Sequence, residues 1–175
     1  QMLVEWNQTA TAYPNDKCIH QLFEEQVART PDALAVIFDA GDQLQSSALT
    51  YRALNERANQ LAHYLCTMGV TTGDLVGVAL ARTPEMIVAV LAILKAGGGY
   101  VPFDPSYPTD RLAYMLENAQ VRLLITSEAM QPQLQWASGV PCFTDWARLA
   151  AQPVENLINN VTPEDVIYCL YTSGS

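Results

Sequence analysis

Residues 75–126, LVGVALARTPEMIVAVLAILKAGGGYVPFDPSYPTDRLAYMLENAQVRLLIT, decide the fold class of this chain. Three strand-like apolar runs alternate there with two helical patterns, at residues 75–80, 85–95, 100–103, 110–118 and 121–126. The first run is apolar without alternation, which is typical of a strand covered on both faces. Strands and helices that alternate over short connections predict an α/β fold: a mostly parallel sheet with helices on both faces.

Further elements are predicted on either side of this stretch. On the N-terminal side the patterns indicate a helix from Ile19, strands at 34–38 and 44–50, and a helix that Thr50 caps. On the C-terminal side they are weaker, and they indicate a short helix at 130–136, a strand at 140–143, a loop, and a last strand at 166–171.

Composition excludes several classes of partner. The chain has 175 residues, half of them apolar, and a formal net charge of −9. Nucleic acids and anionic membranes are held chiefly by clustered Lys and Arg, so neither is expected as a partner. No apolar run reaches the roughly 18 residues that span a bilayer, and the N-terminus lacks the basic and apolar segments of a secretory signal. We therefore expect a cytoplasmic protein.

The cysteines and histidines do not form a metal site by their spacing. Cys18, Cys66, Cys142 and Cys169 lie far apart, and no C-x-x-C pair occurs. Cys66 and Cys169 lie in apolar patterns, which predicts reduced, buried thiols. His20 and His63 are interpreted as histidines on helix surfaces, and no metal ligand is assigned.

The chemistry is expected at the end of the chain. Thr172, Ser173, Gly174 and Ser175 follow an apolar strand directly, and in open α/β sheets ligands bind outside the carboxyl ends of the strands. Such a loop turns backbone N–H groups toward an anion, and its hydroxyls add donors. By itself the tetrapeptide also fits a plain surface turn, and it is not a Walker loop.

Two other features near the strands are interpreted as structural. The glycines at 97–99 follow a helix and precede a strand, which is the reverse of a phosphate cradle, so they predict a helix C-cap with a tight turn. Asp104, between Phe103 and Pro105, is interpreted as a turn residue rather than a ligand.

Several motifs together resemble the adenylation domains of nonribosomal peptide synthetases. The first, second and third core motifs of that family are matched by LTYRALN, by LKAGGGYVPFD with the continuation PTDRL, and by VIYCLYTSGS, at residues 49–55, 94–104, 108–112 and 166–175. Residues 6–24 resemble the segment that joins an upstream condensation domain to the adenylation domain. The second motif is quite specific for amino-acid-activating members, whereas acyl-CoA ligases and luciferases share the third.

The resemblance implies a function and a division of the chain. It implies that residues 1–17 are a linker from a condensation domain and that residues 18–175 are part of an adenylation domain, truncated within its large N-terminal portion. Such domains form aminoacyl-AMP and pyrophosphate from an amino acid and Mg²⁺-ATP. They then transfer the acyl group to the phosphopantetheine thiol of a downstream carrier domain.

The same resemblance assigns the site residues. It implies that Thr172, Ser173, Gly174 and Ser175 contact the ATP phosphates. The family's catalytic lysine, the residues of its amino-acid pocket and the rest of its phosphate loop have no counterparts in the 175 residues. No catalytic residue is therefore assigned, and the chain alone is expected to form no adenylate.

Two other functions remain open from the sequence. One is a fragment of an acyl-CoA ligase or another acid–thiol ligase, and the other is a non-catalytic α/β module that packs against neighbouring domains. A dinucleotide-binding module is disfavoured because no G-x-G-x-x-G follows a strand.

Overall fold

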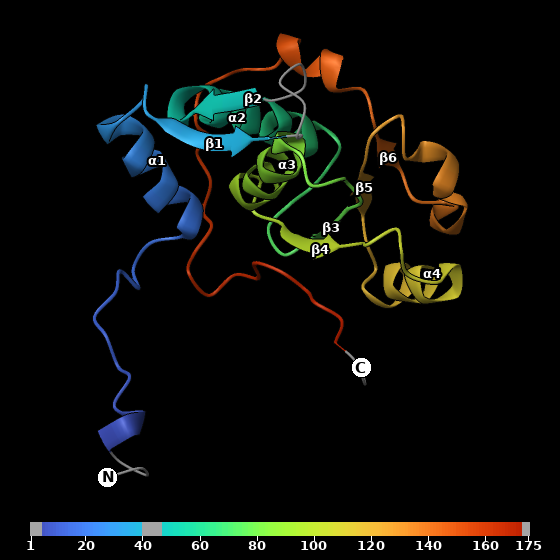
Figure 1. Ribbon diagram of the computed structural model, residues 1–175, viewed down its shortest axis with the longest axis horizontal. Coiled ribbons are helices and arrows are strands. Elements are labelled where there is room, and N and C mark those ends of the chain that lie inside the picture. The colour runs from blue at the N-terminus through green and yellow to red at the C-terminus, as the bar shows by residue number, and fades with distance from the viewer. Residues whose placement is uncertain (1–4, 40–46, 173–175) are drawn as a thin grey trace.

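In the computed structural model of the protein, which describes residues 5–39 and 47–172, four parallel strands form the central sheet (Figure 1). In spatial order these strands are β4 (Gly99–Pro102), β3 (Leu75–Val78), β5 (Leu123–Ile125) and β6 (Cys142–Phe143). Val76 pairs with Tyr100 on one side and with Leu123 on the other. The predicted parallel sheet is thus confirmed, with β3 and β5 as its two inner strands.

Helices cover both faces of this sheet. The α-helices are α1 (Ile19–Arg29), α2 (Tyr51–Thr67), α3 (Pro84–Lys95) and α4 (Thr109–Asn118), and the 3-10 helices are η1 (Glu5–Asn7), η2 (Gln131–Gln133), η3 (Gln135–Ala137) and η4 (Trp146–Ala151). Leu123 and Ile125 pack into a core with α2, α3 and η4, whereas Leu124 packs into a second core with α4 and η3. The alternation of side chains along β5 therefore separates two cores, one on each face of the sheet.

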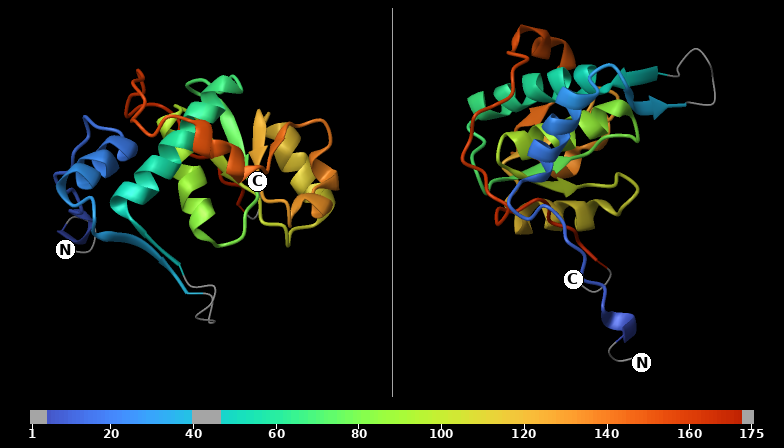
Figure 2. Two further views of the ribbon diagram at one scale, coloured as in Figure 1. Left: turned by 90° about the horizontal axis from the view of Figure 1, so that it is seen from above. Right: turned by 90° about the vertical axis from the view of Figure 1, so that its left-hand side faces the viewer.

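An antiparallel hairpin joins α1 to α2. It consists of β1 (Leu34–Phe38) and β2 (Ser47–Thr50), and it projects from the body of the molecule (Figure 2). The predicted strand at 34–38 is confirmed. The second predicted strand began at residue 44, and its first residues lie outside the described part of the chain. Thr50 caps α2 as predicted, because its side-chain oxygen accepts a hydrogen bond from the backbone N–H of Ala53 at 3.2 Å.

The region after β5 differs most from the sequence prediction. The predicted helix at 130–136 consists of the two short 3-10 helices η2 and η3, and η4 lies where a loop was predicted. The last predicted strand, 166–171, has a single parallel bridge, between Tyr168 and Tyr100 of β4. This segment has β4 as a partner on one side, and most of its large side chains remain exposed, so it does not become a fully paired strand.

Two predictions about burial are wrong. His20, interpreted as a surface histidine, is buried, and burial is the main cause that lowers the pKa of its imidazole. Of the two thiols predicted to be buried, Cys66 is exposed and Cys169 is half-buried, and all four cysteines are free thiols. On α1, His20 is buried and its neighbour Ile19 is exposed, whereas on α2 Leu65 enters the core and its neighbour Cys66 does not.

Among the described residues, none of the helices combines the length and the hydropathy needed to cross a bilayer.

Candidate functional site

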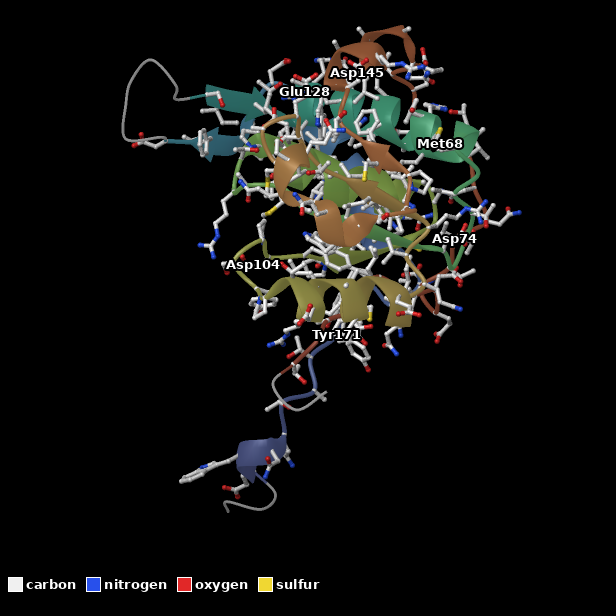
Figure 3. All side chains as sticks on the ribbon, turned by 90° about the vertical axis from the view of Figure 1, so that its right-hand side faces the viewer. Met68, Asp74, Asp104, Glu128, Asp145 and Tyr171 are labelled. Atoms are coloured by element: carbon white, nitrogen blue, oxygen red, sulfur yellow. The ribbon has the colours of Figure 1, made fainter. Side chains whose placement is uncertain are left out.

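The carboxyl ends of the parallel strands lie at one edge of the sheet. Asp104 follows β4 at this edge, whereas Asp74 precedes β3 at the opposite edge. The two residues lie on opposite sides of the molecule in Figure 3. Since ligands of open α/β sheets bind at the carboxyl edge, this is where a site is expected.

A groove of about 1010 Å³ lies at that edge. Its walls come from the hairpin, from α1, α2 and α3, from the segments that follow β3, β4 and β5, and from Leu170 near the end of the chain. Most of the lining is apolar: Val36, Leu54, Met86 and Phe103 are representative. Of the described residues that line the groove, Arg82 alone carries a positive charge.

Asp104 forms the turn that the sequence indicated. Its carboxylate accepts a hydrogen bond from the backbone N–H of Ser106 at 2.9 Å, and its carbonyl accepts one from the N–H of Tyr107 at 3.0 Å. The hydrogen bonds from Ser106, with a smaller contribution from the charge of Arg82, hold the pKa of the Asp104 carboxyl below its ordinary value. Asp104 thus stays ionised and shapes the rim of the groove.

The last described residues run beside β4 toward the same edge. The bridge between Tyr168 and Tyr100 is parallel, so the residues after Tyr168 run in the direction of those after Tyr100, toward Asp104. Leu170 accordingly lines the groove. The phenol of Tyr171 donates instead to the Asn118 side chain at 2.6 Å, and its ring packs on Tyr114 of α4.

Of the four residues predicted to contact the phosphates, the structure describes one. Thr172 is described and is exposed. Ser173, Gly174 and Ser175 lie outside the described residues, so their predicted contacts are not tested by the geometry.

The glycines at 97–99 have the structural role expected from the sequence. Gly97 follows the C-cap of α3 and has a φ of +88°, and Gly98 and Gly99 bring the chain into β4. They lie at the amino edge of the sheet, away from the groove, because they precede β4 rather than follow it.

Sequence analysis missed the groove and the buried state of Lys95. The groove has no local signal, because its lining comes from many separate segments of the chain. Lys95 had a signal: it follows the buried Val88 and Ala92 by seven and three residues, which places it on the same helical stripe.

The described residues suit a nucleotide only in part. The groove has room for a ligand of that size, but an apolar lining with one cation does not neutralise a triphosphate. Phosphate contacts are therefore expected from the loop that begins at Thr172. Among residues 5–39 and 47–172, no three His, Cys, Asp or Glu side chains are grouped so as to hold a metal ion.

Known proteins resemble this chain along its whole length. The profile of the AMP-binding enzyme family matches residues 23–175. Bacitracin synthase 1 of Bacillus licheniformis is 44% identical over 174 residues, which cover 99% of this chain and 3% of the synthase. Tyrocidine synthase 3 of Brevibacillus parabrevis is 44% identical over 178 residues, which cover 100% of this chain and 3% of the synthase.

Solved structures show the same fold. The AMPPNP-bound form of the nonribosomal peptide synthetase FmoA3 superposes with a TM-score of 0.85 at 32% identity, over 95% of this chain and 17% of that chain. Its form with bound α-methyl-L-serine-AMP superposes with a TM-score of 0.81 at the same identity, over 93% of this chain and 18% of that chain. The chain thus spans a small part of the proteins that it matches.

Proposed function

Because the chain belongs to the AMP-binding enzyme family, we propose that it is part of an amino-acid-activating adenylation domain of a nonribosomal peptide synthetase. The parent domain joins the carboxylate of an amino acid to the α-phosphate of ATP, releases pyrophosphate, and then passes the acyl group to a thiol. The names of the similar synthases and the aminoacyl adenylate in one form of FmoA3 support this assignment.

The observation that carries the proposal is the course of the last segment. It meets β4 in a parallel direction at Tyr168 and continues toward the edge where the strands end. Thr172, Ser173, Gly174 and Ser175 then begin a loop whose backbone N–H groups and hydroxyls contact the ATP phosphates. Such donors neutralise and align the triphosphate for attack by the carboxylate.

The remaining parts of the proposal concern partners. Mg²⁺ accompanies ATP, a carrier domain downstream presents phosphopantetheine, and a condensation domain lies upstream in the same polypeptide. Residues 1–17 form the linker to that domain, which is supported by the exposed Trp6 and Tyr13 on a segment that leaves the body of the molecule (Figure 2). A cytoplasmic location belongs to the same proposal, since the reaction consumes ATP.

A hybrid enzyme tests the proposal. Residues 1–175 would replace the matching segment in an adenylation domain of tyrocidine synthase 3, and amino-acid-dependent ATP–pyrophosphate exchange would be measured. We expect the hybrid to retain exchange. Replacing Gly174 with Val should reduce exchange by roughly 100-fold, because side chains there obstruct backbone approach to the phosphates.

The matched control is Ser138→Ala, an exposed serine that follows η3. It should leave exchange unchanged. A folded hybrid that exchanges equally well with and without Gly174→Val would remove the phosphate assignment. Exchange driven by fatty or aryl acids instead of amino acids would favour an acid–thiol ligase.

A further inference from the structure

A buried charge lies away from the groove, where α1 and α3 meet. Lys95, the last residue of α3, has 1% of its side chain exposed and forms an ion pair with Glu24 of α1. Burial is the main cause that lowers the pKa of its ammonium group, and the hydrogen bond and charge of Glu24 act in the opposite direction. A buried ammonium is destabilising unless partners compensate it, so its partners are structurally important.

One of those partners comes from a distant part of the chain. The side-chain oxygen of Asn156 lies 3.4 Å from the Lys95 ammonium, and it also accepts hydrogen bonds at 2.9 Å from Asn55 and from Asn59 of α2. We call Glu24, Asn55, Asn59, Lys95 and Asn156 the Lys95 cluster. A single oxygen of Asn156 therefore joins two helices to a segment without regular secondary structure.

That segment, residues 152–161, is called the return segment here, because it leads from η4 back past α2 and α3 (Figure 1). Side chains from α2 and from the N-cap of α1 bind its backbone near both ends: Asn59 donates to the carbonyl of Val154 at 2.6 Å, and the Cys18 thiol donates to that of Val161 at 3.5 Å. In turn, Asn159 donates to the carbonyl of Lys95 at 2.6 Å. The return segment is thus held by side chains rather than by a strand ladder.

The segment that follows is held to β4 by few backbone hydrogen bonds. Residues 166–171, the edge segment, form two backbone hydrogen bonds with Tyr100. The Tyr100 N–H donates to the carbonyl of Ile167 at 2.9 Å, and the Cys169 N–H donates to the carbonyl of Tyr100 at 3.0 Å. The side chains of Ile167, Tyr168 and Leu170 are 42%, 53% and 54% exposed. Burial of these three side chains therefore contributes little to holding the edge segment. Its far end is anchored by Tyr171, which donates a hydrogen bond to Asn118 and packs on Tyr114 of α4, whereas the end that first meets β4 depends on the course of the preceding residues.

We propose that Lys95 is a positioning residue: the Lys95 cluster fixes the course of the return segment and thereby sets where the edge segment meets β4. None of the five residues of the cluster lines the groove, so its effect on the site passes through the chain. The consequence for phosphate binding rests on the proposed function, but the positioning itself does not.

Amide hydrogen exchange of the 175-residue chain, followed by NMR without nucleotide, tests the positioning. In Asn156→Leu the Lys95 cluster loses its shared acceptor, and we expect the amides of Tyr100 and Cys169 to exchange about tenfold faster or more. The amides of Ala79 and Phe103, which donate to Ile125 and Val78 within the sheet, should keep their protection.

Asn156→Asp is the matched variant, because it has nearly the same size and keeps the acceptor. It should retain protection of Tyr100 and Cys169. A role in filling space alone would predict that Asn156→Leu, whose side chain is also of similar size, retains this protection as well. Asn156 is exposed at the residue level, so both variants are expected to fold. Lys95→Met should repeat the effect of Asn156→Leu, with Lys17→Met as control, since Lys17 forms an exposed ion pair with Glu25.

Unchanged exchange of Tyr100 and Cys169 in Asn156→Leu would overturn the proposal, and so would equal acceleration of all four amides. If Lys95→Met does not fold, the two Asn156 variants decide. Because the exchange experiment contains no nucleotide, its result is independent of that of the hybrid enzyme. The positioning role of Lys95 can be confirmed while the phosphate assignment fails, and the phosphate assignment can be confirmed while the positioning role fails.

Discussion

Gly97 meets two constraints at the end of α3. Its φ of +88° lies in the left-handed region, and a Cβ added there would lie 2.8 Å from the Thr72 hydroxyl and 3.1 Å from Val161. Gly73 has a similar φ of +90°, but a Cβ added there would meet nothing within 4 Å. A substitution of Gly73 therefore tests backbone strain alone, whereas a substitution of Gly97 tests strain together with crowding.

We expect both Gly73→Ala and Gly97→Ala to lower the free energy of unfolding, by different amounts. The left-handed conformation costs an alanine roughly 1–2 kcal/mol at either position. Crowding against Thr72 adds about 1–3 kcal/mol at position 97. Urea denaturation measures both, and equal losses in the two variants would contradict the crowding that the structure indicates.

At the level of residues, the sequence was informative where a residue has a local role. Gly97 and Asp104 were predicted correctly because caps and turns depend on neighbouring backbone groups. The prediction for His20 was wrong, because its burial depends on how α1 packs on the rest of the molecule. The burial of Lys95 was not predicted at all, since one of its partners lies some sixty residues further along the chain. Of the candidate site, the sequence supplied the edge of the sheet but not the groove, and the predicted phosphate contacts of residues 172–175 stay a prediction.

Among the elements, α2 depends on a residue that also ends a strand. Thr50 is the last residue of β2, where it pairs with Leu34, and its hydroxyl caps α2 through the Ala53 amide. The cap thus couples the hairpin to the helix that covers the sheet.

Removing the cap should weaken α2. We expect Thr50→Ala to lower the free energy of unfolding by about 1 kcal/mol, because the Ala53 amide loses its acceptor. Thr50→Ser keeps a hydroxyl and should retain most of the stability. The midpoint of urea denaturation distinguishes them, and a Thr50→Ser variant as unstable as Thr50→Ala would show that the methyl group, not the cap, is responsible.

The elements of residues 75–126 were predictable because their apolar strand runs alternate with amphipathic or apolar helical patterns, and glycine or proline marks several of the boundaries, such as Gly73, Pro84, Gly97 and Pro108. The region after β5 was not, because its 3-10 helices are short and held by tertiary contacts. Trp146 of η4, for example, donates its indole N–H to the carbonyl of Thr126 at 3.1 Å and packs on Phe143. Such tertiary contacts produce no hydrophobic periodicity in the sequence.

For the whole molecule, we expect no amino-acid-dependent ATP–pyrophosphate exchange from the isolated 175-residue chain. The described lining of its groove offers Arg82 as a single cation, which is insufficient to stabilise charge on a reacting triphosphate. The assay would use the twenty standard amino acids, with the hybrid enzyme as positive control. Exchange above background by the isolated chain, with any of them, would contradict this expectation.

The single bridge between Tyr100 and Tyr168 also has a consequence for the order of events during synthesis. The described strands of the central sheet lie before residue 144, and the partner of the edge segment, β4, is complete by residue 102. A chain that emerges from the ribosome N-terminus first can therefore assemble its sheet before the edge segment has left the ribosome. Under the proposed function, the nascent protein would then pass through a folded stage that precedes docking of the edge segment and is not yet competent to bind a nucleotide.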